Sequence, residues 1–174
     1  MTTARTQFGE GFAGDGADAA HVNTVLGAAG SAVETAWATA LATPSAGHAP
    51  FVCVMRPGLP VRPLTLFVNK AEIRGARHGE LTWGPAQAGV ASGVAQCVAE
   101  NVITTDLAAS GLLIAAVWVN WAADDADAVF ENNRVATRMA LTAGATGSPS
   151  VDDVLAEAAE PWNPFYRALG NRLA

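Results

Sequence analysis

The spacing of apolar and polar residues changes period several times along the chain, which predicts mixed α and β structure. Alternating positions indicate strands, and apolar residues three and four apart indicate helices. We expect strands at residues 7–13, 21–27, 51–55, 64–73 and 112–121, and helices at about 32–43, 86–101 and 124–142. This order of elements predicts an α+β domain, most simply a sheet with helices on one face.

Turn and capping residues mark the boundaries of these elements. The segment Gly14-Asp15-Gly16 predicts a turn with positive φ that joins the first two strands as a hairpin. Ser31 is an expected helix N-cap, and Glu34 three residues later would complete a capping box. Pro85 is expected in the first turn of the second helix. Three prolines in residues 56–63 predict a stiff connector without regular structure.

The last part of the chain differs in composition from the rest. Residues 143–174 begin with a linker rich in Gly, Ser and Pro and continue into the aromatic segment 161–166. We expect this tail to dock on the body of the protein or on a neighbouring copy. The whole chain, residues 1–174, is expected to form one domain, because its length suits a single core.

Composition narrows the possible partners and compartments. Of the 174 residues, 51% are hydrophobic and only 15% are charged, below the usual quarter, which predicts surface buried between subunits. The net charge of −6, without a basic cluster, argues against a nucleic-acid partner. The most apolar run, residues 112–119, is too short to span a membrane, and a cytoplasmic location is expected. Cys53 and Cys97 are expected to be buried, reduced thiols.

His21 is the first candidate for chemistry, because it stands at the head of an apolar strand just after the glycine-rich turn. The unperturbed pKa of histidine suits proton exchange near neutral pH. The plainer alternative is a histidine that only makes a structural hydrogen bond. The histidines and cysteines lack metal-ligand spacing, so we expect no metal. Glycine-rich nucleotide-binding motifs and the nucleophile elbow of hydrolases are also missing from the sequence.

Three further polar features stand in apolar surroundings. Lys70, at the end of a hydrophobic strand, either extends into solvent or presents a cation to a pocket. Gln87, expected in the first turn of a helix, either caps that helix or hydrogen-bonds to a planar heterocycle. Arg134 and Arg138 could bind an anion, but we favour a surface stripe in which Arg134 pairs with Glu131.

Taken together, these segments resemble the formaldehyde-activating enzyme family. The resemblance covers nearly the whole chain, in order and with few gaps. Its most specific part is the block Gly84-Pro85-Ala86-Gln87 combined with the strand end Asn69-Lys70. The other matching segments are Gly14-Asp15-Gly16 with His21, residues 27–35, residues 57–65, residues 117–125 and Asn163-Pro164-Phe165.

The resemblance implies a specific reaction and assembly. Members of the family condense formaldehyde with tetrahydromethanopterin to methylenetetrahydromethanopterin and water, a carbon–oxygen lyase reaction without a metal, in which the pterin is a co-substrate. They fold like the second domain of ribosomal protein S5, a two-layer α/β sandwich. They assemble as homopentamers, with the pterin held near subunit boundaries.

The resemblance also assigns roles to individual residues. The catalytic histidine of the family falls on His21, which would protonate the departing hydroxyl as general acid. The lysine and the glutamine of the pterin site fall on Lys70 and Gln87. An apolar position of the same pocket falls on Val52.

Two site positions depart from the family pattern. The aspartate two residues after the histidine is Asn23 here, and the threonine two residues after the lysine is Glu72. Residues i and i+2 of a strand share a face, so both departures are expected beside His21 and Lys70. Asn23 would remove a charge that favours the imidazolium, and Glu72 would add a negative charge near Lys70. Two alternatives to an active enzyme follow: a non-catalytic paralogue that binds a pterin or formaldehyde as carrier or sensor, or an assembly protein with a decayed pocket.

Overall fold

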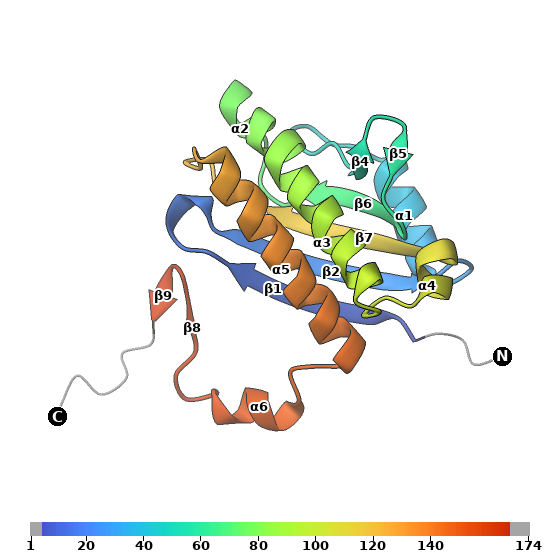
Figure 1. The fold of residues 1–174 in the computed structure, drawn as a ribbon. Coiled ribbons are helices and arrows are strands. Elements are labelled where there is room, and N and C mark those ends of the chain that lie inside the picture. Colours follow the sequence, from blue (N-terminus) through green and yellow to red (C-terminus); the bar gives the residue numbers. More distant parts are fainter. Residues whose placement is uncertain (1–4, 168–174) are drawn as a thin grey trace.

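A five-stranded sheet with the order β1-β2-β7-β6-β3 forms the centre of the computed structural model, which describes residues 5–167 (Figure 1). Its strands are β1 (Gln7–Ala13), β2 (Ala20–Ala28), β7 (Gly111–Trp118), β6 (Leu64–Asn69) and β3 (Phe51–Val52). Neighbouring strands are antiparallel, except that β6 and β7 are parallel. The predicted α+β fold is confirmed.

Helices cover both faces of the sheet. Helices α5 (Ala126–Thr146) and α3 (Gln87–Ala99) lie side by side across one face, and α1 (Ala32–Ala42) lies behind the other (Figure 1). Val33 of α1 packs against Gly27, which shares with His21 the face of β2 turned away from α5. The expectation of helices on one face is therefore wrong for α1. The short helices α4 (Thr105–Ser110) and α6 (Val151–Ala156) were not predicted from the sequence.

The backbone of α5 touches strand β1 directly. A Cβ atom added to Gly9 would lie 1.8 Å from the carbonyl oxygen of Ala140, and one added to Gly11 would lie 2.1 Å from that of Ala136. Only glycine permits this approach. Because strand residues alternate between faces, Glu10 between the two glycines points to the opposite face of the sheet.

The hydrophobic core between the sheet and the α3–α5 layer also holds both thiols. Cys53 and Cys97 are buried and free, as predicted. Burial raises the pKa of Cys53 to about 12 and that of Cys97 to about 11. Both thiols therefore stay protonated at neutral pH. The largest fully buried side chains include Phe67, Leu26, Leu66, Leu81, Ile103 and Leu113.

The predicted hairpin is confirmed, and the predicted helix cap differs in detail. Gly14 and Gly16 have φ of +79° and +61°, and β1 and β2 pair antiparallel across this turn. Ser31 caps α1, but its hydroxyl accepts from the backbone N–H of Val33. The Glu34 carboxylate accepts from the N–H of Gly30, because the N–H of Ser31 already donates to a backbone carbonyl.

The strand expected at residues 51–55 is interrupted at Cys53. Its second half, β4 (Val54–Arg56), leaves the main sheet and pairs with β5 (Leu59–Pro60). The expected connector without regular structure is therefore wrong. This short two-stranded sheet tolerates Pro60, because proline is acceptable in a strand at positions where no backbone N–H has to donate a hydrogen bond. The strand expected at 64–73 ends at Asn69, and the one expected at 112–121 ends at Trp118.

The second predicted helix begins eleven residues earlier than expected. Helix α2 (Gly75–Leu81) continues through a π turn at Thr82–Ala86 into α3, so Pro85 lies inside a helical segment. Proline lacks the N–H that would complete a regular turn, and the wider turn accommodates it. Gln87 follows this turn directly, so it does not stand at a helix N-terminus.

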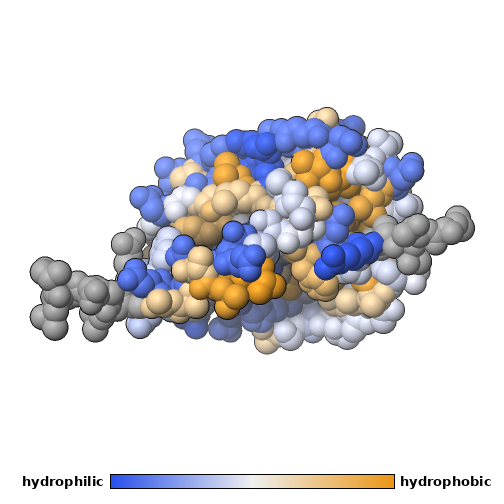
Figure 2. Space-filling view, turned by 90° about the horizontal axis from the view of Figure 1, so that it is seen from below, coloured by the Kyte–Doolittle hydropathy of each residue, from blue (hydrophilic) through white to orange (hydrophobic). Residues whose placement is uncertain are grey.

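The tail contains more structure than predicted. Helix α5 continues to Thr146 with Gly147 as its C-cap, so the linker expected from residue 143 begins later than predicted. Ser150 and Asp153 form a capping box at the start of α6. The short strands β8 (Trp162–Asn163) and β9 (Tyr166–Arg167) follow. Seen from below, the surface carries apolar patches between hydrophilic residues (Figure 2). The exposed apolar side chains of α6 are Val151, Val154 and Leu155. Residues 1–4 of the predicted domain and 168–174 of the predicted tail lie outside the described residues.

We expect Gly11→Ala to destabilise the protein by about 3 kcal/mol or more, because the added methyl group meets helix backbone that cannot move aside. Urea unfolding followed by circular dichroism measures this loss. Gly84→Ala is the matched control, since a Cβ there meets nothing within 4 Å. The control should change the free energy of unfolding by less than about 1 kcal/mol. Equal effects of the two substitutions would contradict the proposed contact.

Candidate active site

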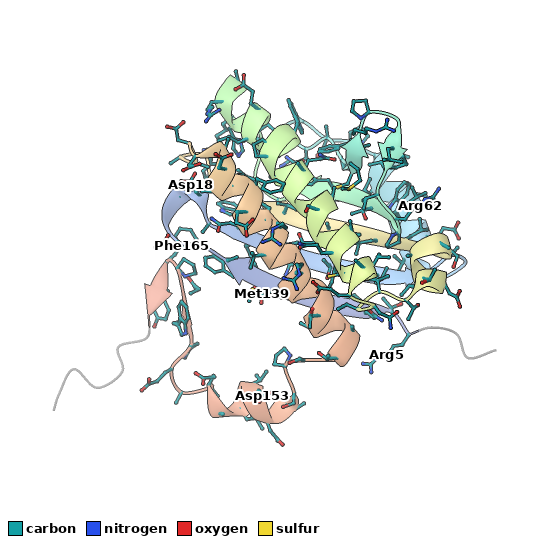
Figure 3. All side chains as sticks on the ribbon, in the orientation of Figure 1. Arg5, Asp18, Arg62, Met139, Asp153 and Phe165 are labelled. Carbon is teal, nitrogen blue, oxygen red and sulfur yellow. The ribbon has the colours of Figure 1, made fainter. Side chains whose placement is uncertain are left out.

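A cavity of about 1050 Å³ opens beside the ends of strands β1, β2, β7 and β6 that lie nearest the Gly14–Gly16 turn. The tail contributes to it, and Figure 3 shows Phe165 of the tail beside the β1–β2 hairpin. The walls are aromatic and the base is polar. The aromatic lining residues are Phe12, Trp118, Trp162 and Phe165, and the polar ones include Glu10, Asp15, His21, Lys70 and Asn120.

Strand register assembles the polar base of the cavity. His21 lies opposite Phe12 on one side and opposite Trp118 on the other, and Asn23 lies opposite Glu10. Residues directly opposite one another in a sheet point to the same face. All five side chains therefore lie on the face of the sheet that α5 leaves uncovered.

Lys70 reaches the same place from the end of β6. Its backbone N–H donates to the carbonyl of Val117 at 2.8 Å, which extends the parallel pairing by one residue. Its Nζ donates to Asn23 Oδ1 at 2.7 Å and lies 3.2 Å from His21 Nδ1. Three of the residues singled out in the sequence, His21, Asn23 and Lys70, thus form one hydrogen-bonded cluster.

Glu10 is the member of this cluster that sequence reasoning missed. Its Oε1 lies 2.9 Å from His21 Nε2, and its side chain is 60% exposed while that of His21 is 39% exposed. A lysine ammonium only donates, so the hydrogen-bond partners assign the neutral tautomer of His21: Nδ1 accepts from Lys70 and Nε2–H donates to Glu10. Counting strand register back from the glycine turn would have indicated Glu10.

The electrostatics of the cluster favour the neutral imidazole. Burial is the main cause that lowers the pKa of His21, and the Lys70 charge lowers it further, while Glu10 raises it. The pKa of Lys70 is also lowered by burial, against the opposing effect of Glu10. Glu10, which the sequence did not indicate, is therefore the carboxylate that raises the pKa of both groups against the larger effect of burial.

Val52 and Gln87 lie in a different cavity. This second pocket, of about 420 Å³, is lined by both residues with Trp83, and it shares no lining residue with the first. Gln87 Oε1 accepts from the backbone N–H of Val54 at 2.5 Å, so this side chain ties α3 to β4 and does not cap the helix. Val52 stands on β3, three strands from His21, which corresponds to about 14 Å across the sheet. A single copy does not bring the two groups together.

Glu72 does not set the charge beside Lys70, and that expectation is wrong. Its Oε2 lies 3.6 Å from Arg74 Nε, and its carbonyl accepts from Trp121 Nε1 at 2.9 Å. The Arg74 guanidinium in turn lies 3.9 Å from the centre of the Trp121 ring. The expectation failed because β6 ends at Asn69, so strand alternation does not extend to residues 70 and 72.

The remaining candidates are structural. Arg134 pairs with Glu131 and also donates to Gln96 Oε1 at 2.6 Å, and Arg138 pairs with Glu100 at 2.7 Å. The predicted surface stripe is confirmed. Within residues 5–167, no group of three or more His, Cys, Asp or Glu side chains is arranged to hold a metal ion. No helix of the described part is long and apolar enough to cross a membrane.

One known protein family matches nearly the whole described part of the chain. The model of the formaldehyde-activating enzyme (Fae) family matches residues 8–166. The chain belongs to this family. The match includes both cavities and the aromatic tail segment, so the two groups of site residues lie in one family domain.

Three relatives illustrate the names that similar proteins carry. A 5,6,7,8-tetrahydromethanopterin hydro-lyase of Methanosarcina barkeri is 37% identical over 161 residues, which cover 92% of this chain and 90% of that protein. Bifunctional enzymes Fae/Hps of Methanosphaera stadtmanae and Archaeoglobus fulgidus are each 35% identical, over 92% and 91% of this chain. The matched regions cover only 42% and 40% of those longer proteins.

We expect the NMR titration midpoint of His21 to lie below that of histidine in an unfolded peptide, because burial and Lys70 both disfavour the imidazolium. Lys70→Met should raise the midpoint, and Glu10→Gln should lower it further. Shifts of opposite sign in two variants of one cluster cannot come from general loosening of the fold. A midpoint that rises in Glu10→Gln would contradict this description.

Proposed function

We propose that this protein condenses formaldehyde with tetrahydromethanopterin to give methylenetetrahydromethanopterin and water. The observation that carries the proposal is the hydrogen-bonded His21–Lys70–Asn23 cluster, of which His21 and Lys70 line an aromatic cavity in a member of this family. A relative named as a tetrahydromethanopterin hydro-lyase matches over nine tenths of the chain. Within this proposal, His21 is the catalytic residue.

The chemistry needs one proton at a defined point. A pterin nitrogen adds to formaldehyde and gives a hydroxymethyl adduct, which loses its hydroxyl only after that oxygen is protonated. His21 is the general acid for this step. Because the resting ring is neutral, it takes its proton from the Lys70 ammonium 3.2 Å away, and Glu10 at 2.9 Å stabilises the imidazolium that forms.

The aromatic walls supply binding and exclude water. Phe12 and Trp118 flank the His21 position on the sheet, and Trp162 and Phe165 come from the tail. Flat apolar faces suit a reduced pterin ring. Holding both reactants beside the proton donor converts a bimolecular encounter into a local one, which can account for much of a rate gain.

The two cavities are joined, in this proposal, across a subunit boundary. Gln87 and Val52 of one copy contact the pterin whose reacting nitrogen lies near His21 of the next, in a homopentamer. Two features favour contacts between copies. The side chain of Phe8 is 69% exposed, and only 15% of all residues are charged, so apolar surface is available for such contacts. Glu72 has an indirect role in this proposal. Its backbone carbonyl accepts a hydrogen bond from Trp121, and Trp121 packs edge-on against the cavity residue Trp118 with ring centres 5.4 Å apart.

The remaining features of the proposal concern the chain as a whole. We assign residues 1–174 to a single domain whose tail, which follows α5, docks at the cavity. The two free thiols favour a reducing compartment, and we place the protein in the cytoplasm. Its net charge of −6 favours a small-molecule function without nucleic acid.

A stopped-flow assay tests the reaction, with formaldehyde mixed with tetrahydromethanopterin or, in parallel, tetrahydrofolate. The wild type should accelerate methylene formation above the uncatalysed rate, and His21→Ala should lose about 100-fold or more of that gain. Absence of acceleration with either pterin would overturn the proposal. Saturable pterin binding by calorimetry, without turnover, would then favour the carrier or sensor hypothesis.

Mixed assemblies test whether the site is shared. His21→Ala removes the proton donor of one half, and Gln87→Glu keeps the acceptor for the Val54 N–H while it removes the amide donor of the other half. Each variant alone should be inactive. Refolded together in equal amounts, they should regain about a quarter of the wild-type rate, because some interfaces then join two intact halves. No recovery in mixed assemblies would contradict a shared site.

A further inference from the structure

Lys70 is the one lysine in the 174-residue sequence. The chain holds ten lysine and arginine residues in total, so its nine other permanently cationic side chains are guanidinium groups. The single side-chain amine therefore lies at the base of the proposed formaldehyde site. Amines, and lysine in particular, form Schiff bases with carbonyl substrates.

The partners of Lys70 suit an amine that must lose its proton. Its Nζ contacts an amide oxygen, that of Asn23, and an imidazole nitrogen, that of His21. Among the described residues, no carboxylate lies within ion-pairing distance of Lys70. An aspartate at position 23 would hold the ammonium by charge, whereas Asn23 accepts the hydrogen bond without stabilising the charge.

A proton acceptor is already in contact. His21 Nδ1, 3.2 Å from Nζ, accepts in the resting tautomer, and Glu10 lies on the far side of the ring at 2.9 Å. A proton that moves from Lys70 to His21 leaves a neutral amine beside an imidazolium that is paired with a carboxylate. Half-burial of Lys70 favours the same transfer, because it disfavours the ammonium.

We propose that Lys70 is a nucleophile that carries formaldehyde as a protonated imine before the carbon passes to the pterin. This inference rests on the proposed function and deepens it: the hydroxyl that His21 protonates is then carried on a Lys70 adduct, which forms before the pterin attacks, and not on a pterin adduct. In the first step, the Nζ lone pair forms a bond to the formaldehyde carbon, and the carbonyl oxygen becomes a hydroxyl. The proton held by His21 then converts that hydroxyl to water, which leaves as the C=N bond forms. The lysine ammonium and formaldehyde have become a protonated imine and water, with charge conserved.

The second step returns the lysine. One secondary amine of the pterin attacks the imine carbon, the carbon–Nζ bond breaks, and the second pterin nitrogen closes the methylene bridge. Two protons leave the pterin nitrogens, and Lys70 recovers its ammonium form with His21 as the intermediate carrier. The sum of both steps is the condensation itself, so no further reactant is needed.

Reductive trapping tests the covalent step without the pterin. Limiting formaldehyde and cyanoborohydride are added to the assembled protein, and peptide mass spectrometry locates each added methyl group. The matched control is Arg56→Lys, which introduces an ordinary amine at an exposed position outside the cavity. Lys70 should be methylated at least about 100-fold faster than that introduced amine, because only Lys70 has an adjacent acid–base group. Equal rates at the two positions would overturn the proposal.

The condensation assay separates this inference from the proposed function. Tetrahydromethanopterin added before the reductant should abolish the methyl label on Lys70. Lys70→Arg, which keeps the positive charge and removes the amine, should reduce the stopped-flow rate to the uncatalysed value. A Lys70→Arg protein that still accelerates condensation would overturn the nucleophile while the proposed function stands. A wild type without acceleration would overturn the function itself, whatever the trapping shows.

Discussion

The direct contact between the α5 backbone and strand β1 is the constraint on which the rest of the site depends. Gly9 and Gly11 are pressed against the carbonyls of Ala140 and Ala136, so neither position of β1 has room for a side chain. Alternation then commits Glu10 to the other face, where strand pairing aligns it with the cluster on β2. The close packing of β1 against α5 on one side of the sheet thus determines that the Glu10 carboxyl group lies on the other side.

That carboxyl group organises a chain of groups that differ in their protonation. The Glu10 side chain is largely exposed, burial lowers the pKa of His21 and so favours its neutral form, and burial lowers the pKa of Lys70 as well. Asn23 completes the chain as an uncharged acceptor. The contacts between Glu10, His21, Lys70 and Asn23 are all about 3 Å long, so a proton can pass from Lys70 to His21 and back, which suits a site that must both deliver and recover it.

Local patterns predicted the hairpin, the central strand and the His21 position, because each depends on alternation or on glycine geometry within a few residues. The misses needed longer-range information. Glu10 becomes significant only once strand register is known, and Glu72 was misplaced because the end of β6 is set by tertiary pairing. The π turn at Pro85 hid the start of α2, since a proline is usually read as a helix boundary.

The β1–β2 pairing also limits how this site can diverge. One residue inserted in either strand would exchange its two faces, bring a side chain against the α5 carbonyls and turn Glu10 or His21 into the core. An insertion in either strand would therefore disrupt the site, whereas an exchange of side chains in fixed places would leave the strand pairing intact. Asn23 is a position where such an exchange would act: its side chain accepts a hydrogen bond from Lys70 without a charge, so a carboxylate there would change proton affinity while the architecture stays unchanged.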